Sequence, residues 1–300
     1  MFWLLYLFFL FKPVSLLKFC DEPTVVSNKL SYKIIGGRDA ADSEFPFQSL
    51  LVSYNSSGQG IMCGATVIDD YWLLTAGHCV QQLLEKTYVL LGVETINNPK
   101  FTLKVARTIT HPGYSSTTGK NDIALIQTKR STARKGIMPV CLVRDDRKLL
   151  EENPKGVVTG FGLRIVNSTS TSTVLQRSDV LMKTTVPIIP DLSCKLNWKR
   201  LSFGAIAVGS QQICAGSLLH GTAPGDSGGP LLVRNRRGDL IQVGITSFGA
   251  DGLEALFDQE TYPGVYTRVS SYISWIEKYV NSSQKSGFMV VLGSALWFLL

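Results

Sequence analysis

The chain has 300 residues, of which 45% are hydrophobic and 18% are charged. A chain of this size buries one large core or two smaller ones, and its 27 glycines and 12 prolines, spread between short apolar runs, favour many strands and turns over a helical fold. The formal net charge of +7 is small and dispersed, which argues against a nucleic-acid partner.

The first eleven residues, MFWLLYLFFLF, are an apolar run that Lys12 and Pro13 close. This run is too short to cross a bilayer but long enough for the hydrophobic part of a signal peptide, although the usual early positive charge is missing. We predict a signal peptide over residues 1–19, with a cleavage point near Ser15 to Phe19. Export would suit three potential N-glycosylation sequons, at Asn55, Asn167 and Asn281.

Short apolar runs rich in β-branched residues follow in two sets, broken by Gly, Asn and Pro. The first set covers 47–54, 61–68, 87–93, 101–110 and 122–127, and the second covers 156–162, 178–189, 229–234, 240–249 and 263–270. No repeat of 20 to 50 residues relates them. The pattern predicts an all-β protein of two β domains joined near residues 129–141.

A helical period is visible only near the end of the chain, in SSYISWIEKYVNSS. There Ile273, Ile276, Tyr279 and Val280 fall on one face. We expect a helix that packs on the domain surface.

A serine hydroxyl becomes a useful nucleophile only when an imidazole takes its proton, and a buried carboxylate must orient that imidazole. The chain has three histidines, His78, His111 and His220. His78 follows an apolar strand and precedes a cysteine, whereas the residues after His111 predict a turn. Asp122 directly precedes an apolar strand, so it is drawn partly inside, where a carboxylate needs a partner. Together with Ser227, these residues occur in the order His, Asp, Ser.

That order, with the motifs LTAGHC, NDIALI and GDSGGP around it, resembles the chymotrypsin-like (trypsin-fold) serine proteases over residues 34–280. The resemblance implies two six-stranded antiparallel β-barrels with the triad in the cleft between them. It implies that Ser227 is the nucleophile, His78 the general base and then acid, and Asp122 the residue that orients His78. The backbone N–H groups of Gly225 and Ser227 would form the oxyanion hole.

The stretch SYKIIGGRDA is similar to the activation site of that family. Cleavage after Lys33 would free the α-amino group of Ile34, whose ammonium would pair with the buried carboxylate of Asp226 and order the oxyanion hole. We therefore expect residues 20–33 to be an activation propeptide, residues 34–281 to be the protease domain, and the precursor to be a nearly inactive zymogen.

Six cysteines allow 15 pairings. The resemblance selects one: Cys63 with Cys79, Cys194 with Cys214, and Cys20 with Cys141, the last of which would tether the propeptide after cleavage. Two bridges that are common in the family are absent, because Gly156 and Val233 stand where one would be and Ala223 replaces a cysteine of the other. The second absence bears on how the substrate pocket is held.

Specificity rests on three glycines that match pocket positions of the family. Gly221 stands where trypsin-like members carry an aspartate, and Gly249 and Gly264 match the pocket walls. The pattern predicts a preference for Phe, Tyr, Leu or Met on the acyl side of the cleaved bond. The alternative is that an acid of the inserted loop from Asp251 to Tyr262 reaches the pocket; its candidates are Glu254, Asp258 and Glu260.

Short stretches, EFPF, LTAGHCV and APGDSGGPLL, are also similar to the cercarial elastases of parasitic flukes. The apolar end of the chain, FMVVLGSALWFLL, is too short for a spanning helix. With the NSS and QKSG that precede it, residues 282–300 resemble a GPI-attachment signal; a membrane-associated tail and a terminus without function are the alternatives.

The sequence thus predicts a secreted or surface-anchored serine endopeptidase, a hydrolase with no cofactor and no metal site. Its expected partners are protein or peptide substrates, an activating trypsin-like protease and protein protease inhibitors, with membrane attachment through the C-terminus. Two other classes stay open: an inactive protease homologue that acts as a binding module, and an adhesive ectodomain. Covalent labelling by a fluorophosphonate separates the first of these from an enzyme.

Overall fold

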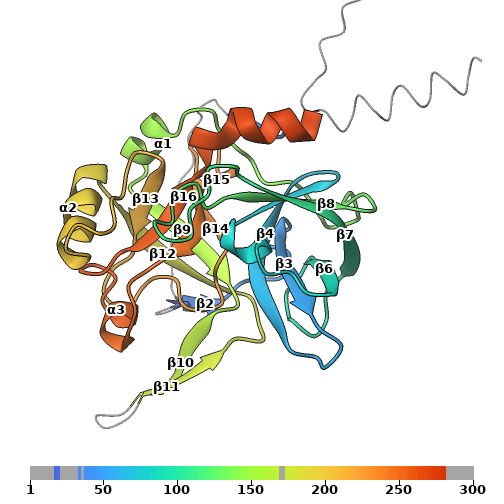
Figure 1. Ribbon diagram of the computed structural model, residues 1–300, viewed down its shortest axis with the longest axis horizontal. Helices are drawn as coiled ribbons and strands as arrows, with labels where there is room; N and C mark the ends of the chain where they lie inside the picture. The colour runs from blue at the N-terminus through green and yellow to red at the C-terminus, as the bar shows by residue number, and fades with distance from the viewer. Residues whose placement is uncertain (1–16, 21–32, 35–36, 169–172, 282–300) are drawn as a thin grey trace, which may run out of the picture.

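The computed structural model describes residues 17–20, 33–34, 37–168 and 173–281. The apolar run at the start of the chain, most of the expected propeptide and the expected GPI signal lie outside these residues. The described strands form two neighbouring barrels, the first at the right of Figure 1 and the second at the left.

The first barrel closes on itself in the strand order β3-β4-β5-β8-β7-β6, and every neighbouring pair is antiparallel. Its strands are β3 (Gln48–Tyr54), β4 (Gly60–Asp69), β5 (Trp72–Thr75), β6 (Lys86–Leu91), β7 (Phe101–Thr110) and β8 (Ala124–Thr128). The five predicted apolar runs match five of these strands. The short β5 is the strand expected before His78.

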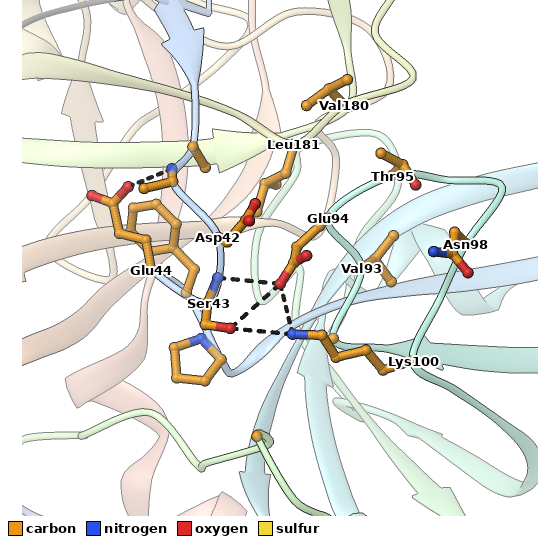
Figure 2. Close-up of a pocket in the computed structure, with 16 residues that line it drawn as sticks. Asp42, Ser43, Glu44, Val93, Glu94, Thr95, Asn98, Lys100, Val180 and Leu181 are labelled. Carbon is orange, nitrogen blue, oxygen red and sulfur yellow. Dashed lines mark hydrogen bonds and ion pairs between the residues drawn. The ribbon is translucent and has the colours of Figure 1, made fainter.

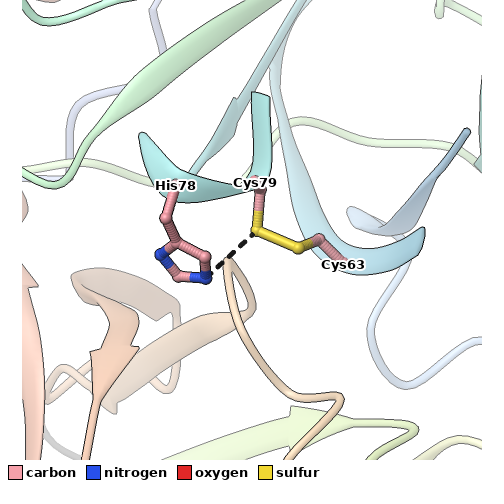
Figure 3. Close-up of side chains that lie close together, drawn as sticks. All are labelled: Cys63, His78 and Cys79. Carbon is pink, nitrogen blue, oxygen red and sulfur yellow. Dashed lines mark hydrogen bonds between the residues drawn. A yellow bond between two sulfur atoms is a disulfide. The ribbon is translucent and has the colours of Figure 1, made fainter. Parts of the chain in front are cut away.

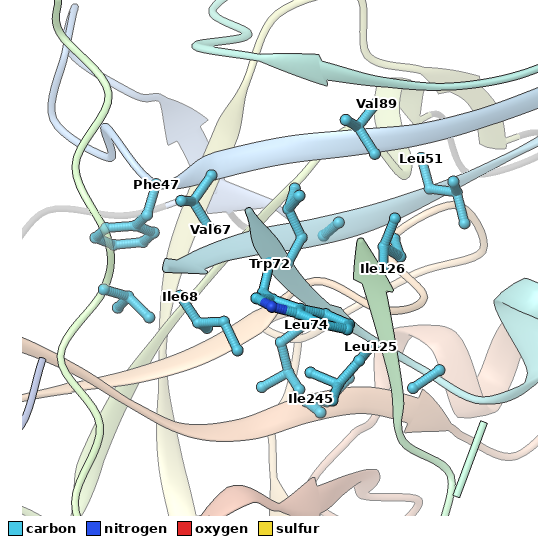
Figure 4. Close-up of a cluster of buried hydrophobic side chains, with 14 of the residues drawn as sticks. Phe47, Leu51, Val67, Ile68, Trp72, Leu74, Val89, Leu125, Ile126 and Ile245 are labelled. Atoms are coloured by element: carbon cyan, nitrogen blue, oxygen red, sulfur yellow. The ribbon is translucent and has the colours of Figure 1, made fainter. Parts of the chain in front are cut away.

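The core of this barrel is shown in Figure 4, where side chains from several strands meet. Leu51 of β3, Trp72 of β5 and Leu125 of β8 are completely buried. Ile245 belongs to the second barrel but lies in the same cluster. The two barrels therefore share apolar contacts, and burial of these side chains holds them against each other.

An eight-stranded sheet runs in the order β1-β2-β12-β13-β16-β15-β14-β9, and a further pairing of β12 with β9 closes six of its strands into the second barrel. The six strands are β9 (Lys155–Gly160), β12 (Met182–Ile189), β13 (Gln212–Ala215), β14 (Pro230–Arg234), β15 (Leu240–Phe248) and β16 (Gly264–Arg268). Two short strands, β1 (Lys33–Ile34) and β2 (Gly37–Asp39), extend this sheet beyond the barrel. The predicted fold of two six-stranded antiparallel barrels is confirmed.

The remaining elements lie around the barrels. The hairpin of β10 (Leu163–Ser168) and β11 (Thr173–Arg177) projects from the second barrel in Figure 1. The helices are α1 (Arg147–Glu152), α2 (Asp191–Leu201) and α3 (Leu253–Phe257), and the 3-10 turns are η1 (His78–Val80) and η2 (Val269–Tyr272).

A last helix covers residues 273–281, as its sequence period predicts. Ile273, Ile276 and Val280 are buried, and Tyr279 is partly buried against the same core. That core is the one of the first barrel, so this helix, at the top of Figure 1, packs on the first barrel although it follows the last strand of the second.

The start of the described chain is also packed against the folded domain. Leu17 is 4% exposed and belongs to the core of the first barrel. The N–H of Leu142 donates to the carbonyl of Lys18 at 2.7 Å, and the N–H of Cys20 donates to the carbonyl of Leu142 at 3.3 Å. Residues 17–20 therefore lie along the connection between the barrels.

Candidate active site

His78 begins the 3-10 turn η1, directly after β5 and Gly77. The next residue, Cys79, forms a disulfide with Cys63 of β4, as Figure 3 shows. This bridge fixes the turn to the wall of the first barrel. The His78 ring lies beside it, with Nε2 at 3.6 Å from the Cys79 Sγ.

Asp122 holds the imidazole of His78 through two contacts. The His78 Nδ1 lies 2.8 Å from Asp122 Oδ2, and the backbone N–H of His78 donates to Asp122 Oδ1 at 2.8 Å. Asp122 is only 2% exposed. A buried carboxylate at this distance favours the tautomer with a proton on Nδ1, which leaves Nε2 as an acceptor.

The second barrel completes the surroundings of Asp122. The Ser247 hydroxyl of β15 donates to Asp122 Oδ2 at 2.6 Å, and the Thr267 hydroxyl of β16 donates to the Asp122 carbonyl at 2.8 Å. Three donors thus satisfy the buried carboxylate, which compensates its desolvation. The position of His78 depends on both barrels.

Ser227 lies in the turn before β14, and its backbone is held by the first barrel. The N–H of Gly64 in β4 donates to the Ser227 carbonyl at 2.7 Å, and the Thr75 hydroxyl donates to the Gly64 carbonyl at 2.8 Å. Gly228 has a φ of +77°, and a Cβ there would overlap both Thr75 Oγ1 and the Gly64 carbonyl. Glycine is therefore required after Ser227 for the turn to approach the other barrel.

His78 and Ser227 line two adjoining cavities. Ser227 lines a cavity of about 340 Å³, while His78 and Asp122 line one of about 310 Å³. The two cavities share the walls Ser247, Phe248 and Gly249. The three residues expected to form a triad therefore line two cavities that have three wall residues in common.

Asp226 points away from the cleft into the second barrel and is 1% exposed. Its carboxylate accepts the N–H of Gly162 at 2.8 Å and the N–H of Ala223 at 2.9 Å. Burial raises the pKa of Asp226 to about 6, although these two hydrogen bonds and the charge of Arg177 act in the opposite direction. Among the described residues, no cation forms an ion pair with it.

Gly225 has a φ of +105°, a conformation that favours glycine, and a Cβ there would lie 3.0 Å from the Gly162 Cα. Lys33 and Ile34 form β1, which pairs in parallel with β2 at Gly37.

The three disulfides join Cys20 to Cys141, Cys63 to Cys79 and Cys194 to Cys214, as the resemblance implies. The last of these ties α2 to β13. Cys63, His78 and Cys79 bring three possible ligand atoms within 4.8 Å of one another. Because the two sulfur atoms are bonded to each other, neither is a thiolate, and we do not assign a metal to this cluster.

Of the pocket residues, Gly249 and Gly264 line the cavity beside Ser227, as expected. Gly221 does not line this cavity directly. A Cβ at Gly221 would overlap the Gln259 carboxamide, which lies over it. Gln259 lines the cavity and comes from the inserted loop. The sequence carried no signal for it, since one glutamine among the polar residues of an insertion is unremarkable.

One acid of the inserted loop, Asp251, lines the cavity, whereas the three named candidates do not. Glu254 accepts the Tyr262 hydroxyl at 3.2 Å, and Asp258 accepts the N–H of Thr261 at 3.1 Å. Neither they nor Glu260 line the cavity; the acid that does is the exposed Asp251.

A further cavity, of about 170 Å³, lies between the segment before β3 and the loop after β6 (Figure 2). The Lys100 ammonium lies 2.6 Å from Glu94 Oε1 and 3.2 Å from Ser43 Oγ, and it holds the pKa of Glu94 below its usual value. The Glu94 carboxylate is therefore already paired with a cation.

The candidate glycosylation sites differ in what surrounds them. Asn55 lies in the turn between β3 and β4, where its Oδ1 accepts the N–H groups of Ser57 and Gln59. Asn281 ends the last helix, and Asn167 lies in β10. Among the described residues, no helix is both long and apolar enough to span a membrane.

Comparison with known proteins identifies the family. The family described as Trypsin matches residues 34–276. Vitamin K-dependent protein C of Oryctolagus cuniculus is 31% identical over 84% of this chain and 53% of its own length. Transmembrane protease serine 7 of Mus musculus is 35% identical, over 85% of this chain and 29% of its own length. Trypsin Blo t 3 of Blomia tropicalis is 35% identical, over 81% of this chain and 85% of its own length.

The chain therefore belongs to the trypsin family of serine proteases. It spans about half the length of the rabbit relative and less than a third of the mouse one.

Proposed function

We propose that the protein is a serine endopeptidase that uses Ser227, His78 and Asp122. The observation that carries this proposal is the buried Asp122 carboxylate, which holds the His78 ring in one cavity. Ser227 lines the cavity next to it. The Ser227 Oγ attacks the substrate carbonyl, and its proton passes to His78 Nε2. The N–H groups of Gly225 and Ser227 stabilise the oxyanion, worth about 10²–10³ in rate per donor.

The same residues complete the reaction. His78 returns the proton to the leaving amine, which breaks the peptide bond and leaves an acyl ester on Ser227. A water molecule then loses a proton to His78 and attacks the ester, which releases the acid product and restores the serine. Asp122 stays ionised throughout and stabilises the imidazolium.

The proposal includes a zymogen. Cleavage between Lys33 and Ile34 frees an ammonium that pairs with Asp226, whose buried carboxylate has hydrogen bonds but no ion-pair partner among the described residues of the uncut chain. An activating protease with tryptic specificity would make the cut. Lys33→Gln should therefore stay inactive after treatment with trypsin, whereas the native chain gains activity; equal activity of the two would contradict the zymogen.

The propeptide stays attached in this scheme. Cys20 is bonded to Cys141 of the domain, and Leu17 is buried in the first barrel. We therefore place the end of the signal peptide before Leu17, earlier than the predicted residue 19. On non-reducing gels the cut chain should run as one band that reductant separates, and N-terminal sequencing of the small fragment locates its start.

The proposed pocket selects large apolar side chains over Lys and Arg. Glu254, Asp258 and Glu260 lie elsewhere, and Asp251, which lines the cavity, is exposed to solvent, so no buried carboxylate among the described residues awaits a cation there. The wall glycines Gly249 and Gly264 leave room for a ring. The proposed location is extracellular or at the cell surface, consistent with three disulfides, and the tail is proposed as a GPI signal. Protein protease inhibitors would bind the same cleft.

Labelling with a fluorophosphonate tests the function. The trypsin-treated protein should be labelled, and Ser227→Ala should not be, while Ser210→Ala, which changes an exposed serine, serves as the matched control. Absence of label in the cut native protein would favour the inactive homologue that acts as a binding module.

A further inference from the structure

Gln259 lines the same cavity as Ser227 and lies just after α3. The residue is only 4% exposed. Its Nε2 donates to the Thr222 carbonyl at 2.6 Å and to the Leu256 carbonyl at 3.4 Å. These two bonds fix which end of the carboxamide is the nitrogen and hold the side chain against the wall of the second barrel.

The other end of the carboxamide is unpaired. Gln259 Oε1 is buried and has no hydrogen-bond partner, which is unusual for a buried polar atom. It lies among three glycines: a Cβ would be 3.2 Å from it at Gly216 and 3.4 Å from it at Gly264, and would overlap it at Gly221. A side chain at Gly221 would displace the carboxamide, and one at Gly216 would overlap the Gln259 Cβ, so the position of Gln259 requires these two glycines.

The rest of the cavity is suited to an apolar ring. Phe248, Ala255 and Leu256 line it, with Gly249 and Gly264 on the walls. A substrate side chain that fills this space has apolar contacts along its length and meets the Gln259 carboxamide at its far end. In the free enzyme Oε1 has almost no accessible surface and the two Nε2 bonds hold the carboxamide, so an entering donor reaches Oε1 only when the soft terminal torsion of the glutamine turns.

We propose that Gln259 is the specificity-determining residue of this pocket and that its Oε1 accepts a hydrogen bond from the phenol of a tyrosine on the acyl side of the cleaved bond. The inference rests on the proposed function and refines its substrate class. A phenylalanine leaves the acceptor unpaired, and a lysine or arginine buries a charge against a neutral amide. Tyrosine alone supplies both a ring for the walls and a neutral donor at the ring's far end.

The native activated enzyme should therefore cleave a tyrosine substrate about tenfold faster, in kcat/KM, than the matched phenylalanine substrate, the worth of one neutral hydrogen bond. Gln259→Leu keeps the volume and removes the acceptor, so the Tyr-to-Phe ratio should fall to about one while phenylalanine cleavage persists. Rates are expressed per fluorophosphonate-labelled site, which counts only folded, active enzyme. A native ratio near one, or an unchanged ratio in Gln259→Leu, overturns the proposal.

Gln259→Glu is the isosteric charge variant. A carboxylate at this place should raise kcat/KM for lysine substrates by about a hundredfold or more, because the buried cation then has a partner. Leu253→Glu adds the same charge to the same loop at an exposed position and should leave the lysine rate unchanged. An equal gain in both variants would attribute the effect to long-range charge and overturn the role of Gln259.

A binding measurement separates this inference from the proposed function. The Ser227→Ala chain should bind p-cresol about tenfold more tightly than toluene, and the difference should vanish in a Ser227→Ala/Gln259→Leu chain. If the native protein is not labelled by the fluorophosphonate but p-cresol still binds more tightly than toluene, the proposed catalytic function is refuted and the role of Gln259 is not. Equal binding of p-cresol and toluene, with labelling intact, refutes the role of Gln259 alone.

Discussion

The turn that carries His78 is joined to β4 by the Cys63–Cys79 disulfide, whereas the loop that carries Ser227 has Ala223 at the position where the family resemblance implies a bridging cysteine. In the first barrel, a covalent bond and the Asp122 carboxylate hold the imidazole. In the second barrel, the corresponding loop is held by hydrogen bonds, two of which end on a single buried carboxylate.

That carboxylate is Asp226, which joins Ala223 to Gly162 through their N–H groups. The contrast indicates that the His78 turn is held by a covalent bond, while the order of the Ser227 loop depends on an ionisable group. A change of charge near Asp226 can therefore alter the Ser227 side without disturbing the His78 side. The following predictions separate the two sides.

The largest effect is expected on the Ser227 side. Ser227→Ala should lower kcat by about 10⁶-fold, since the nucleophile is lost, and should leave the free energy of unfolding nearly unchanged. Progress curves with a chromogenic peptide and urea denaturation measure the two quantities. Residual turnover above about a thousandth of the native rate would rule out the serine mechanism.

The next effect tests the His78 side. Asp122→Asn should lower kcat by about 10⁴-fold, because an amide that donates to His78 Nδ1 stabilises the wrong tautomer. Ser247→Ala removes only one donor to the same carboxylate and should cost much less, about tenfold. Steady-state kinetics compare the two, and equal losses would mean that Ser247, rather than the charge of Asp122, controls the imidazole.

Much of this arrangement could be predicted from the sequence. The run at 101–110 matches β7 (Phe101–Thr110) residue for residue, because its β-branched residues and flanking turns are local signals. The motifs around His78, Asp122 and Ser227 likewise locate the site, since each residue lies at the edge of an apolar strand. The face of the last helix follows from its period, and Ile276 and Val280 are fully buried.

The features that sequence could not supply depend on tertiary contacts. Helix α2 has no apolar stripe: Cys194 and Trp198 are its buried residues, and it is held by a disulfide and by the bond from Trp198 Nε1 to the Pro263 carbonyl at 3.2 Å. The place of Gln259 depends on how the inserted loop folds back over Gly221. Neither arrangement has a periodic pattern that sequence analysis detects.

A pair of disulfide deletions sharpens the comparison of the two sides. Removing Cys63–Cys79 by double alanine substitution should lower the free energy of unfolding by about 3 kcal/mol, as expected for a loop of about this length. Removing Cys194–Cys214, which spans a similar separation, is the matched control with a similar loss. Only the removal of Cys63–Cys79 should also lower kcat, because only that bridge supports the His78 turn. An equal fall in kcat after removal of Cys194–Cys214 would show that the Cys63–Cys79 bridge has no specific role in catalysis.

The smallest effect concerns Asp226 and is read from pH. In the uncut folded chain its pKa is raised from 3.8 to about 6, so between these values the folded chain binds more protons than the unfolded chain. Stability therefore decreases as pH rises through this window, because deprotonation leaves a buried carboxylate without an ion-pair partner. Between about pH 4 and pH 7 the contribution of Asp226 to the free energy of unfolding should fall by about 2 kcal/mol.

Asp226→Asn isolates this contribution, since an amide keeps the shape but does not titrate. Urea denaturation at a series of pH values, in a Ser227→Ala background that prevents self-cleavage, should show the extra pH dependence in the uncut chain and its loss in Asp226→Asn. After cleavage at Lys33, pairing with the Ile34 ammonium should lower the pKa of Asp226, so the same comparison should then show stability rising with pH. Identical pH profiles for the cut and uncut chains would mean that no cation reaches Asp226, and that the Ser227 loop is organised independently of activation.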